Sequence, residues 1–125
     1  MIIGIGCDIV DHKISESLEW DSKPHTINRI LSDEEMMLYD SHKTLNFIAG
    51  RFAAKEAILK CLGTGMQDGI SLRQIQILKS EDGNPIVQLM GQAKQISDNM
   101  GVDAWHLSIS HCASYSIAFA IAEKK

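Results

Sequence analysis

The sequence lacks paired cysteines, a long apolar run and an excess of positive charge, and each absence excludes a class of protein. Its three cysteines are far apart with no CxxC spacing, so a disulfide framework and a zinc site are not expected. No run approaches the roughly 20 apolar residues of a membrane-spanning helix, and the apolar start has no basic leader. The formal net charge of -4 gives no general attraction to nucleic acid. These features predict a cytoplasmic protein with free thiols.

The composition is that of an ordinary folded protein. With 45% hydrophobic and 22% charged residues in 125, the chain has enough apolar surface for one core, and disorder is not expected. Repeats, low-complexity runs and linker-like stretches are absent. We therefore predict a single domain over residues 1–125.

Local signals place several elements along the chain. Residues 2–7 are apolar and β-prone, and their two glycines predict a strand approached closely by another backbone. The "SDEE" at 32–35 fits a capping box before a short helix. Thr44 can cap the longest helix, which Gly63 would end in a left-handed conformation. Residues 15–26 give no clear signal.

Two hairpins and one more short helix complete the prediction. "IQILKSEDGNPIVQLM" has two β-prone runs around a turn, and "WHLSIS" and "YSIAFAIA" both alternate between apolar and other residues. A short helix is expected in "GQAKQISDNMG". Because repeated βαβ units are absent, the pattern predicts an α+β fold with a largely antiparallel sheet, one long central helix and short helices.

Asp8 is the first candidate for a functional residue. It follows the apolar run at residues 2–7, which would place its carboxylate at the edge of the core. A helix or turn cap is one interpretation. A metal ligand or general base is the other, and the residue's position alone does not decide between them.

Charged residues in "RFAAKEAILKCLGTG", at 51–65, form the second candidate. Glu56 and Lys60 are four residues apart on one helical face, a spacing typical of a solvated ion pair. The alanines beside them would let a ligand or a neighbouring chain approach closely. A glycine-containing loop beside an ammonium group can also bind phosphate through backbone N–H groups, although the P-loop order is absent. Lys55 is assigned no role and is expected on the solvated face.

His111 ends the "SIS" strand and is the third candidate. A histidine there is commonly structural, but it could also bind an anion or transfer a proton. Carboxylates combined with a phosphate-binding group would suit Mg²⁺, which prefers one or two carboxylates and substrate phosphate oxygens.

Three segments together resemble one family. "GIGCDIV", "GRFAAKEAILKCLGTG" and "HLSISH" occur in the order and at the spacing of the bacterial holo-acyl-carrier-protein synthases, the small single-domain members of the phosphopantetheinyl transferase superfamily. "NRILSDEE" and "DGNP" are also in place. The resemblance implies transfer of 4′-phosphopantetheine from coenzyme A to a serine of apo-acyl carrier protein, leaving adenosine 3′,5′-bisphosphate, in support of fatty acid biosynthesis.

The resemblance also implies roles for individual residues. Asp8 and Glu56 would be the Mg²⁺ ligands, and Lys60 would hold the pyrophosphate of coenzyme A. Arg51 and His111 would lie near its 3′-phosphate. The loop that lines the same pocket would comprise Gly63, Thr64 and Gly65. The family is typically trimeric, with sites shared between adjacent subunits, so a homotrimer is expected.

Two points stay open at this stage. The base that accepts the serine proton could be a metal-bound water, Glu56 acting through such a water, or a carboxylate of the "SDEE" segment. In addition, family members usually carry an arginine shortly after "DIV", in a segment that contacts the carrier protein, and the spacing here is one residue shorter. Here Lys13 keeps the charge but lacks the bidentate geometry of a guanidinium group.

Two other functions compete with the transferase. A non-catalytic module that binds coenzyme A or a nucleotide would not need two metal-binding carboxylates. A structural oligomerisation domain would use Glu56 and Lys60 only as a salt bridge. In that case Glu56→Gln would leave coenzyme A binding and its metal dependence unchanged.

Overall fold

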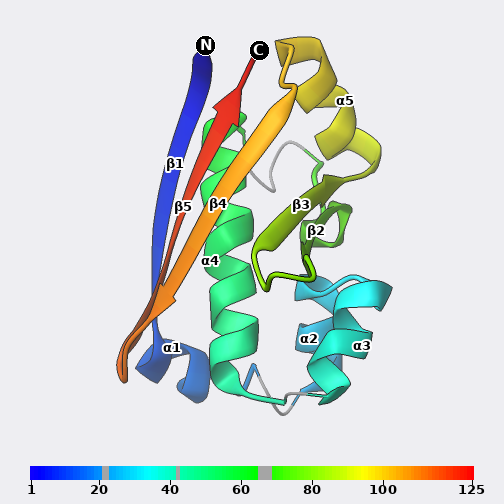
Figure 1. The fold of residues 1–125 in the computed structure, drawn as a ribbon. Helices are drawn as coiled ribbons and strands as arrows, with labels where there is room; N and C mark the ends of the chain where they lie inside the picture. The colour runs from blue at the N-terminus through cyan, green and yellow to red at the C-terminus, as the bar shows by residue number, and fades with distance from the viewer. Residues whose placement is uncertain (21–22, 42, 65–68) are drawn as a thin grey trace.

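The computed structural model describes residues 1–20, 23–41, 43–64 and 69–125 and contains two antiparallel sheets (Figure 1). The larger sheet has the strand order β1-β5-β4, and the smaller one is the hairpin β2-β3. The strands are β1 (Ile2–Asp11), β2 (Ile75–Lys79), β3 (Pro85–Leu89), β4 (Ala104–His111) and β5 (Tyr115–Glu123). The predicted α+β class with antiparallel sheets is therefore confirmed.

Five α-helices lie in the described part of the chain, among them the long one that was predicted. They are α1 (His12–Ser17), α2 (Pro24–Ile30), α3 (Asp33–Ser41), α4 (Leu45–Cys61) and α5 (Gly91–Met100), and a short 3₁₀ helix, η2 (Leu72–Gln74), precedes β2. The segment without a clear signal contains the end of α1 and the start of α2. None of these helices combines the length and the hydrophobicity needed to cross a bilayer.

The predicted helix starts are confirmed by their hydrogen bonds. The backbone N–H of Ser32 donates to Glu35 Oε1 at 3.0 Å, and the N–H of Glu35 donates to Ser32 Oγ at 3.3 Å, which is the reciprocal capping box. At the start of α4, Thr44 Oγ1 accepts from the N–H of Phe47 at 3.2 Å. These caps fix where α3 and α4 begin.

Helix α4 packs directly against the backbone of the larger sheet. A Cβ added at Gly6 would overlap the carbonyl oxygen of Ala57, and one at Gly4 would lie 2.6 Å from that of Cys61. The neighbouring strand β5 turns Ala118 and other small side chains toward the core, and Ala57 is itself fully buried. The close approach expected at the glycines is therefore confirmed. The alanines of α4 were expected to let a ligand or a neighbouring chain approach, but they are buried against this chain's own sheet.

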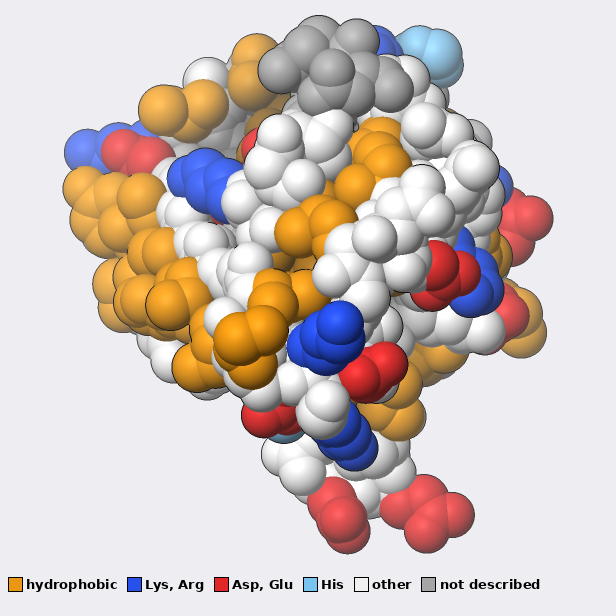
Figure 2. Space-filling model, turned by 90° about the horizontal axis from the view of Figure 1, so that it is seen from above, with side chains coloured by type: hydrophobic (Ala, Val, Ile, Leu, Met, Phe, Trp, Pro, Cys, Tyr) orange, Lys and Arg blue, Asp and Glu red, His pale blue; other side chains and the backbone are white. Residues whose placement is uncertain are grey.

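The other face of the larger sheet is apolar and uncovered in the single chain. Ile5, Ile9 and Phe119 are 67%, 59% and 51% exposed. They come from β1 and β5, which pair so that Ile5 lies opposite Ile121 and Cys7 opposite Phe119. Figure 2 shows hydrophobic side chains gathered along the side of the molecule on which β1 lies in Figure 1.

Candidate functional site

Asp8 and Lys60 are brought together by the packing of β1 on α4. Strand β1 continues past the predicted end, so that Asp8 lies inside the strand. Its carboxylate is 20% exposed, and Oδ1 lies 3.3 Å from Lys60 Nζ. The capping interpretation of Asp8 is wrong, because Asp11 caps α1 by accepting from the N–H of Lys13 at 2.9 Å.

Lys60 crosses to the strand and is anchored there twice. Its ammonium donates to the carbonyl oxygen of Cys7 at 2.7 Å as well as to Asp8. The solvated helix pair suggested by the spacing of Glu56 and Lys60 is therefore not the arrangement found, since the ion-pair partner of Lys60 comes from β1. An ammonium has three donors. Two are used within the protein, and the side chain remains 53% exposed.

Glu56 lies half-buried on the same side of α4, close enough to Asp8 for the two carboxylates to repel each other. Burial raises the pKa of Glu56, the negative charge of Asp8 raises it further, and Lys60 lowers it. Two carboxylates in such a position favour a cation between them. Their oxygens are the ligands that a hard divalent ion such as Mg²⁺ prefers.

The loop after α4 corrects part of the phosphate-binding prediction. Gly63 has a φ of +68°, as expected for the residue that ends the helix. Its N–H and that of Thr64 donate to the carbonyl oxygens of Lys60 and Leu59, both at 3.1 Å. These two N–H groups are therefore not available to bind phosphate as the sequence suggested, because they cap the end of the helix. Gly65 lies outside the described residues.

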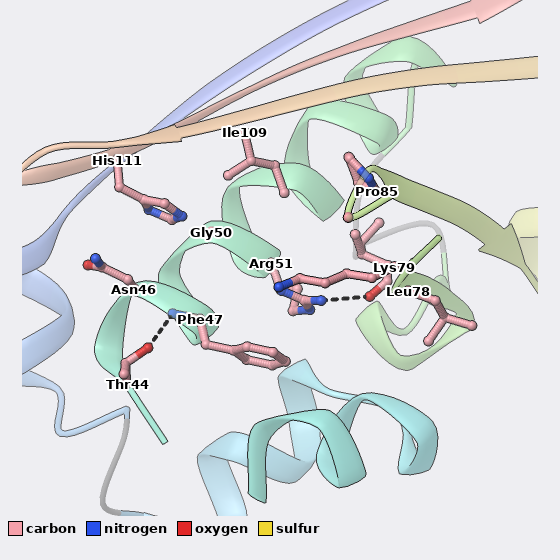
Figure 3. A pocket seen from close by; sticks show the side chains of 12 residues that line it. Thr44, Asn46, Phe47, Gly50, Arg51, Leu78, Lys79, Pro85, Ile109 and His111 are labelled. Atoms are coloured by element: carbon pink, nitrogen blue, oxygen red, sulfur yellow. Dashed lines mark hydrogen bonds between the residues drawn. The ribbon is translucent and has the colours of Figure 1, made fainter. Parts of the chain in front are cut away.

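Arg51 and His111 meet in a separate pocket with a volume of about 310 Å³. Figure 3 shows both side chains in this pocket, beside Phe47 and Gly50 of α4, Ile109 of β4 and Pro85 of the β2-β3 hairpin. The N-terminal half of α4 forms its floor. Because it carries a guanidinium, an imidazole and the ammonium of Lys79, the pocket suits an anionic ligand.

Arg51 is held rigidly although it borders the pocket. Its Nη2 donates to the carbonyl oxygen of Ile77 at 3.1 Å, and its Cζ lies 3.8 Å from the centroid of the Phe47 ring. Burial lowers the pKa of Arg51, and the charge of Glu35 opposes that shift. Nε is buried without a hydrogen-bond partner and lies 3.8 Å from Glu35 Oε2.

Lys55 is not on a solvated face, so that prediction is wrong. Both Lys55 and Glu35 have fully buried side chains, and Lys55 Nζ lies 2.6 Å from Glu35 Oε1. The ammonium also donates to the carbonyl oxygens of Ile30 and of Leu72. Glu35 Oε2 in turn accepts from the N–H of Ile77 at 3.1 Å. Lys55 therefore joins α2, α3 and η2 to the core.

The two groups of site residues lie at opposite edges of the larger sheet. Asp8 is on β1 and His111 on β4, and β5 runs between them, since Asp8 pairs with Ala118 and Ile109 pairs with the same residue from the other side. Adjacent strands are about 4.8 Å apart. We name the cluster of Asp8, Glu56 and Lys60 the carboxylate half-site, and the pocket of Arg51 and His111 the basic half-site.

Several site residues were missed by the sequence analysis. Asn46 and Lys79 line the basic half-site. Ser116 contacts His111, and His12 contacts Ser116. The only local signal near this pocket was the predicted hairpin turn "DGNP", which contributes Gly83 and Pro85 to the lining. The remaining residues come from separate elements with no common spacing, so no local pattern could identify them.

Comparisons with known proteins point to one family. The family model described as the 4′-phosphopantetheinyl transferase superfamily matches residues 4–120. A holo-[acyl-carrier-protein] synthase of Clostridium novyi is 45% identical over 98% of this chain and 88% of its own. The crystal structure of the synthase from Neisseria meningitidis has a TM-score of 0.89 at 36% identity, covering 99% of this chain and 100% of that one. The Helicobacter pylori synthase in complex with coenzyme A has a TM-score of 0.81 at 33% identity, covering 95% and 99%.

Proposed function

Because the chain belongs to the 4′-phosphopantetheinyl transferase superfamily, within its holo-[acyl-carrier-protein] synthases, we infer that it transfers 4′-phosphopantetheine from coenzyme A to a serine of apo-acyl carrier protein. The other product is adenosine 3′,5′-bisphosphate. The transfer breaks the pyrophosphate of coenzyme A and forms a phosphodiester with the serine oxygen. We propose that it serves fatty acid biosynthesis in the cytoplasm, a location in keeping with three free cysteines.

The observation that best supports this function is the carboxylate half-site. Asp8 and Glu56 come from different elements and have no helical pairing with each other, yet burial and the nearby charge of Asp8 both raise the pKa of Glu56. A structural ion pair would need only one carboxylate beside Lys60. The second carboxylate adds repulsion that Lys60 offsets and that a bound cation would relieve further, which favours a metal-dependent enzyme over a structural domain.

Asp8 and Glu56 are the residues that would hold Mg²⁺. Their oxygen donors, their mutual repulsion and their partial burial fit a hard divalent ion that also takes oxygens from a substrate. When bound, the ion would neutralise charge that develops on the pyrophosphate oxygens during transfer. The protein's own contribution is to fix both carboxylates on rigid elements, a strand and a helix.

Lys60 would neutralise the leaving group from the protein side. Its anchors on Cys7 and Asp8 hold the ammonium at the edge of β1 and leave one donor for a pyrophosphate oxygen. Because the position is fixed before the substrate arrives, little reorganisation is needed as charge builds up. We propose that Gly63, Thr64 and Gly65 line the pyrophosphate end of the site. The N–H groups of Gly63 and Thr64 would not contact the ligand, because they cap α4.

Of the carboxylates in the "SDEE" segment, Glu35 is poorly placed to accept the serine proton. Glu35, the buried carboxylate of the "SDEE" segment, accepts hydrogen bonds at both oxygens from within the core and has no exposed surface. It cannot reach a substrate hydroxyl. We propose Glu56 as the proton acceptor, acting through water, since its carboxylate lies at the half-site beside Asp8 and Lys60 and is only partly buried.

The basic half-site would bind the adenosine 3′-phosphate end of coenzyme A. Arg51 and His111 supply the donors, and Phe47, Ile109 and Pro85 supply apolar surface. An Arg guanidinium suits a phosphate because it presents donors in a planar fork. Gly50 leaves room in the floor of the pocket for the His111 ring, since a Cβ there would lie 2.7 Å from its Cε1.

We propose that neighbouring copies of the chain in a homotrimer form each complete site. Each chain carries its two half-sites at opposite edges of one sheet, so a ring of three chains can bring the carboxylate half-site of one next to the basic half-site of another. The uncovered apolar face with Ile5, Ile9 and Phe119 is the surface that such an assembly would bury. A stable monomer at micromolar concentration would contradict this.

The function is tested by incubating the protein with coenzyme A, Mg²⁺ and an apo-acyl carrier protein and weighing the carrier by mass spectrometry. We expect the carrier to gain one phosphopantetheine. Chelation of the metal, Asp8→Asn and Glu56→Gln should each slow this by roughly 100-fold or more. Asp98→Asn, which alters an exposed carboxylate of α5, is the matched control and should not. A carrier of unchanged mass, where a known synthase succeeds, would contradict the function.

A further inference from the structure

His111 is connected to the interior by a chain of side chains that the proposed reaction does not use. His12 begins α1, Ser116 lies in β5, and His111 ends β4. Ser116 is fully buried and His12 is 6% exposed. Ser116 Oγ lies 2.7 Å from His12 Nε2 and 2.7 Å from His111 Nδ1, so one hydroxyl joins the two imidazoles.

A backbone carbonyl fixes the direction of this chain. His12 Nδ1 lies 3.2 Å from the carbonyl oxygen of Ala113, which can only accept, so Nδ1 of His12 carries a hydrogen. In the neutral imidazole Nε2 is then an acceptor, and the Ser116 hydroxyl donates to it. The same hydroxyl oxygen accepts from His111, whose hydrogen must therefore be on Nδ1.

The remaining nitrogen of His111, Nε2, faces the pocket. Figure 3 shows the ring directed from the end of β4 toward α4, above Gly50. A Cβ at Gly50 would lie 3.2 Å from Nε2 and 2.7 Å from Cε1, so the ring rests on the helix backbone. The hydrogen bond at Nδ1 and this packing together hold the ring in one orientation.

We propose that His12 and Ser116 are positioning residues that lock His111 in its Nδ1–H tautomer, so that Nε2 is presented to the phosphate end of coenzyme A. The proposal rests on the proposed function. With Nδ1 committed to Ser116, the ring takes up its second proton on the pocket side. Nε2 then donates a charge-assisted hydrogen bond to the phosphate monoester. A tautomer with hydrogen on Nε2 alone would turn an acceptor nitrogen toward Ser116, whose hydroxyl hydrogen is already donated to His12.

Charged groups around the ring favour the neutral state before the ligand binds. Burial lowers the pKa of His111, as does a positive charge on His12 of α1 when that ring is protonated, and as does Arg51 of α4. Lys79 adds a further positive charge at the pocket from β2. A bound phosphate reverses this balance, because its negative charge stabilises the imidazolium.

The tautomer can be read directly from the ring ¹⁵N shifts of His111 in the ligand-free protein, at a pH where the ring is neutral. The wild type should show hydrogen on Nδ1. Ser116→Ala removes the acceptor of that hydrogen, and His12→Phe frees the serine hydroxyl to donate to His111, so both should shift the ring toward the Nε2–H form. His12→Gln keeps an acceptor for Ser116 and should retain the wild-type tautomer.

Steady-state kinetics test the consequence for coenzyme A. Ser116→Ala and His12→Phe should raise KM for coenzyme A about tenfold, the effect of losing roughly one hydrogen bond to a charged group, with a smaller change in kcat. His12→Gln should restore most of the loss. Ser114→Ala, in the exposed turn beside Ala113, is the control and should behave as the wild type.

Failure of this inference differs from failure of the proposed function. An Nε2–H tautomer in the wild type overturns the inference. So does an unchanged tautomer, or an unchanged KM, in Ser116→Ala, a small substitution that leaves the fold intact. A wild type without transferase activity would overturn the proposed function, and the tautomers of the ligand-free proteins would still decide whether the chain orients His111.

Discussion

Glu35 and Lys55 act on the basic half-site although neither reaches it. The pair is fully buried, and Glu35 Oε2 lies 3.8 Å from Arg51 Nε while it accepts from the N–H of Ile77. Ile77 is also the residue whose carbonyl oxygen holds Arg51 Nη2. A change at Glu35 therefore disturbs the core and the position of Arg51 together.

We predict that Glu35→Gln lowers the free energy of unfolding by about 3–5 kcal/mol, because it leaves a buried ammonium without its charge partner. Urea unfolding at fixed protein concentration measures this. The matched control is Glu35→Gln/Lys55→Met, which removes both charges and should recover most of the loss. A single variant as stable as the wild type would show that the pair is not buried as the structure has it.

The same pair gives a pH dependence of stability. Burial lowers the pKa of Lys55 to about 8 from its usual 10.5, an effect that Glu35 only partly offsets. Between these two values the unfolded chain binds more protons at Lys55 than the folded one, so the free energy of unfolding rises with pH across that window. We predict that the wild type gains stability relative to Glu35→Gln/Lys55→Met between about pH 8 and pH 10.5. If the difference in unfolding free energy between the two proteins stayed constant or fell over this range, the lowered pKa of Lys55 would be contradicted.

The contact between β1 and α4 forms the carboxylate half-site. Asp8 on the strand and Lys60 on the helix meet only because glycines let the two backbones approach. Side chains at Gly4 or Gly6 would separate the elements and move the Asp8 carboxylate away from Lys60. The packing of these elements and the chemistry of the site thus depend on the same residues.

We predict that Gly6→Ala lowers the free energy of unfolding by about 3 kcal/mol, since the new methyl group would overlap backbone that cannot rotate away. Gly83→Ala is the comparison. Gly83 has a φ of +83° with open space around it, so the substitution should cost about 1 kcal/mol from backbone strain alone. Chemical denaturation ranks the two. A Gly6→Ala protein no less stable than Gly83→Ala would contradict the close packing.

Local signals in the sequence predicted the helix caps and the hairpins, because each depends on neighbouring residues. The two glycines of β1 predicted the close approach of another backbone, but not that this backbone is α4. Lys55 could not be placed in this way. Its partner Glu35 lies on another helix, α3, and a lysine in the middle of a helix ordinarily extends into solvent. The clustering of Asp8 with Glu56 was expected from the family resemblance and not from any periodicity. The chain through His12 and Ser116 joins residues more than 100 positions apart.

The whole molecule presents two incomplete sites and one uncovered apolar face. The carboxylate half-site is at the β1 edge, the basic half-site is at the β4 edge, and the exposed side chains of β1 and β5 lie on the sheet face away from α4. An assembly that buries this face and places the β1 edge of one chain beside the β4 edge of the next would complete every site. A site shared between chains therefore accounts for two observations, the uncovered apolar face and the separation of the two half-sites.

Complementation between two inactive variants tests this account most directly. We would co-express Asp8→Asn and Arg51→Ala chains with different tags, purify oligomers that contain both, and measure phosphopantetheine transfer to the carrier. In a ring of three that contains both variants, one junction joins an intact carboxylate half-site to an intact basic half-site, so we predict about a third of the wild-type activity. Mixed oligomers no more active than either variant alone would contradict a site shared between chains.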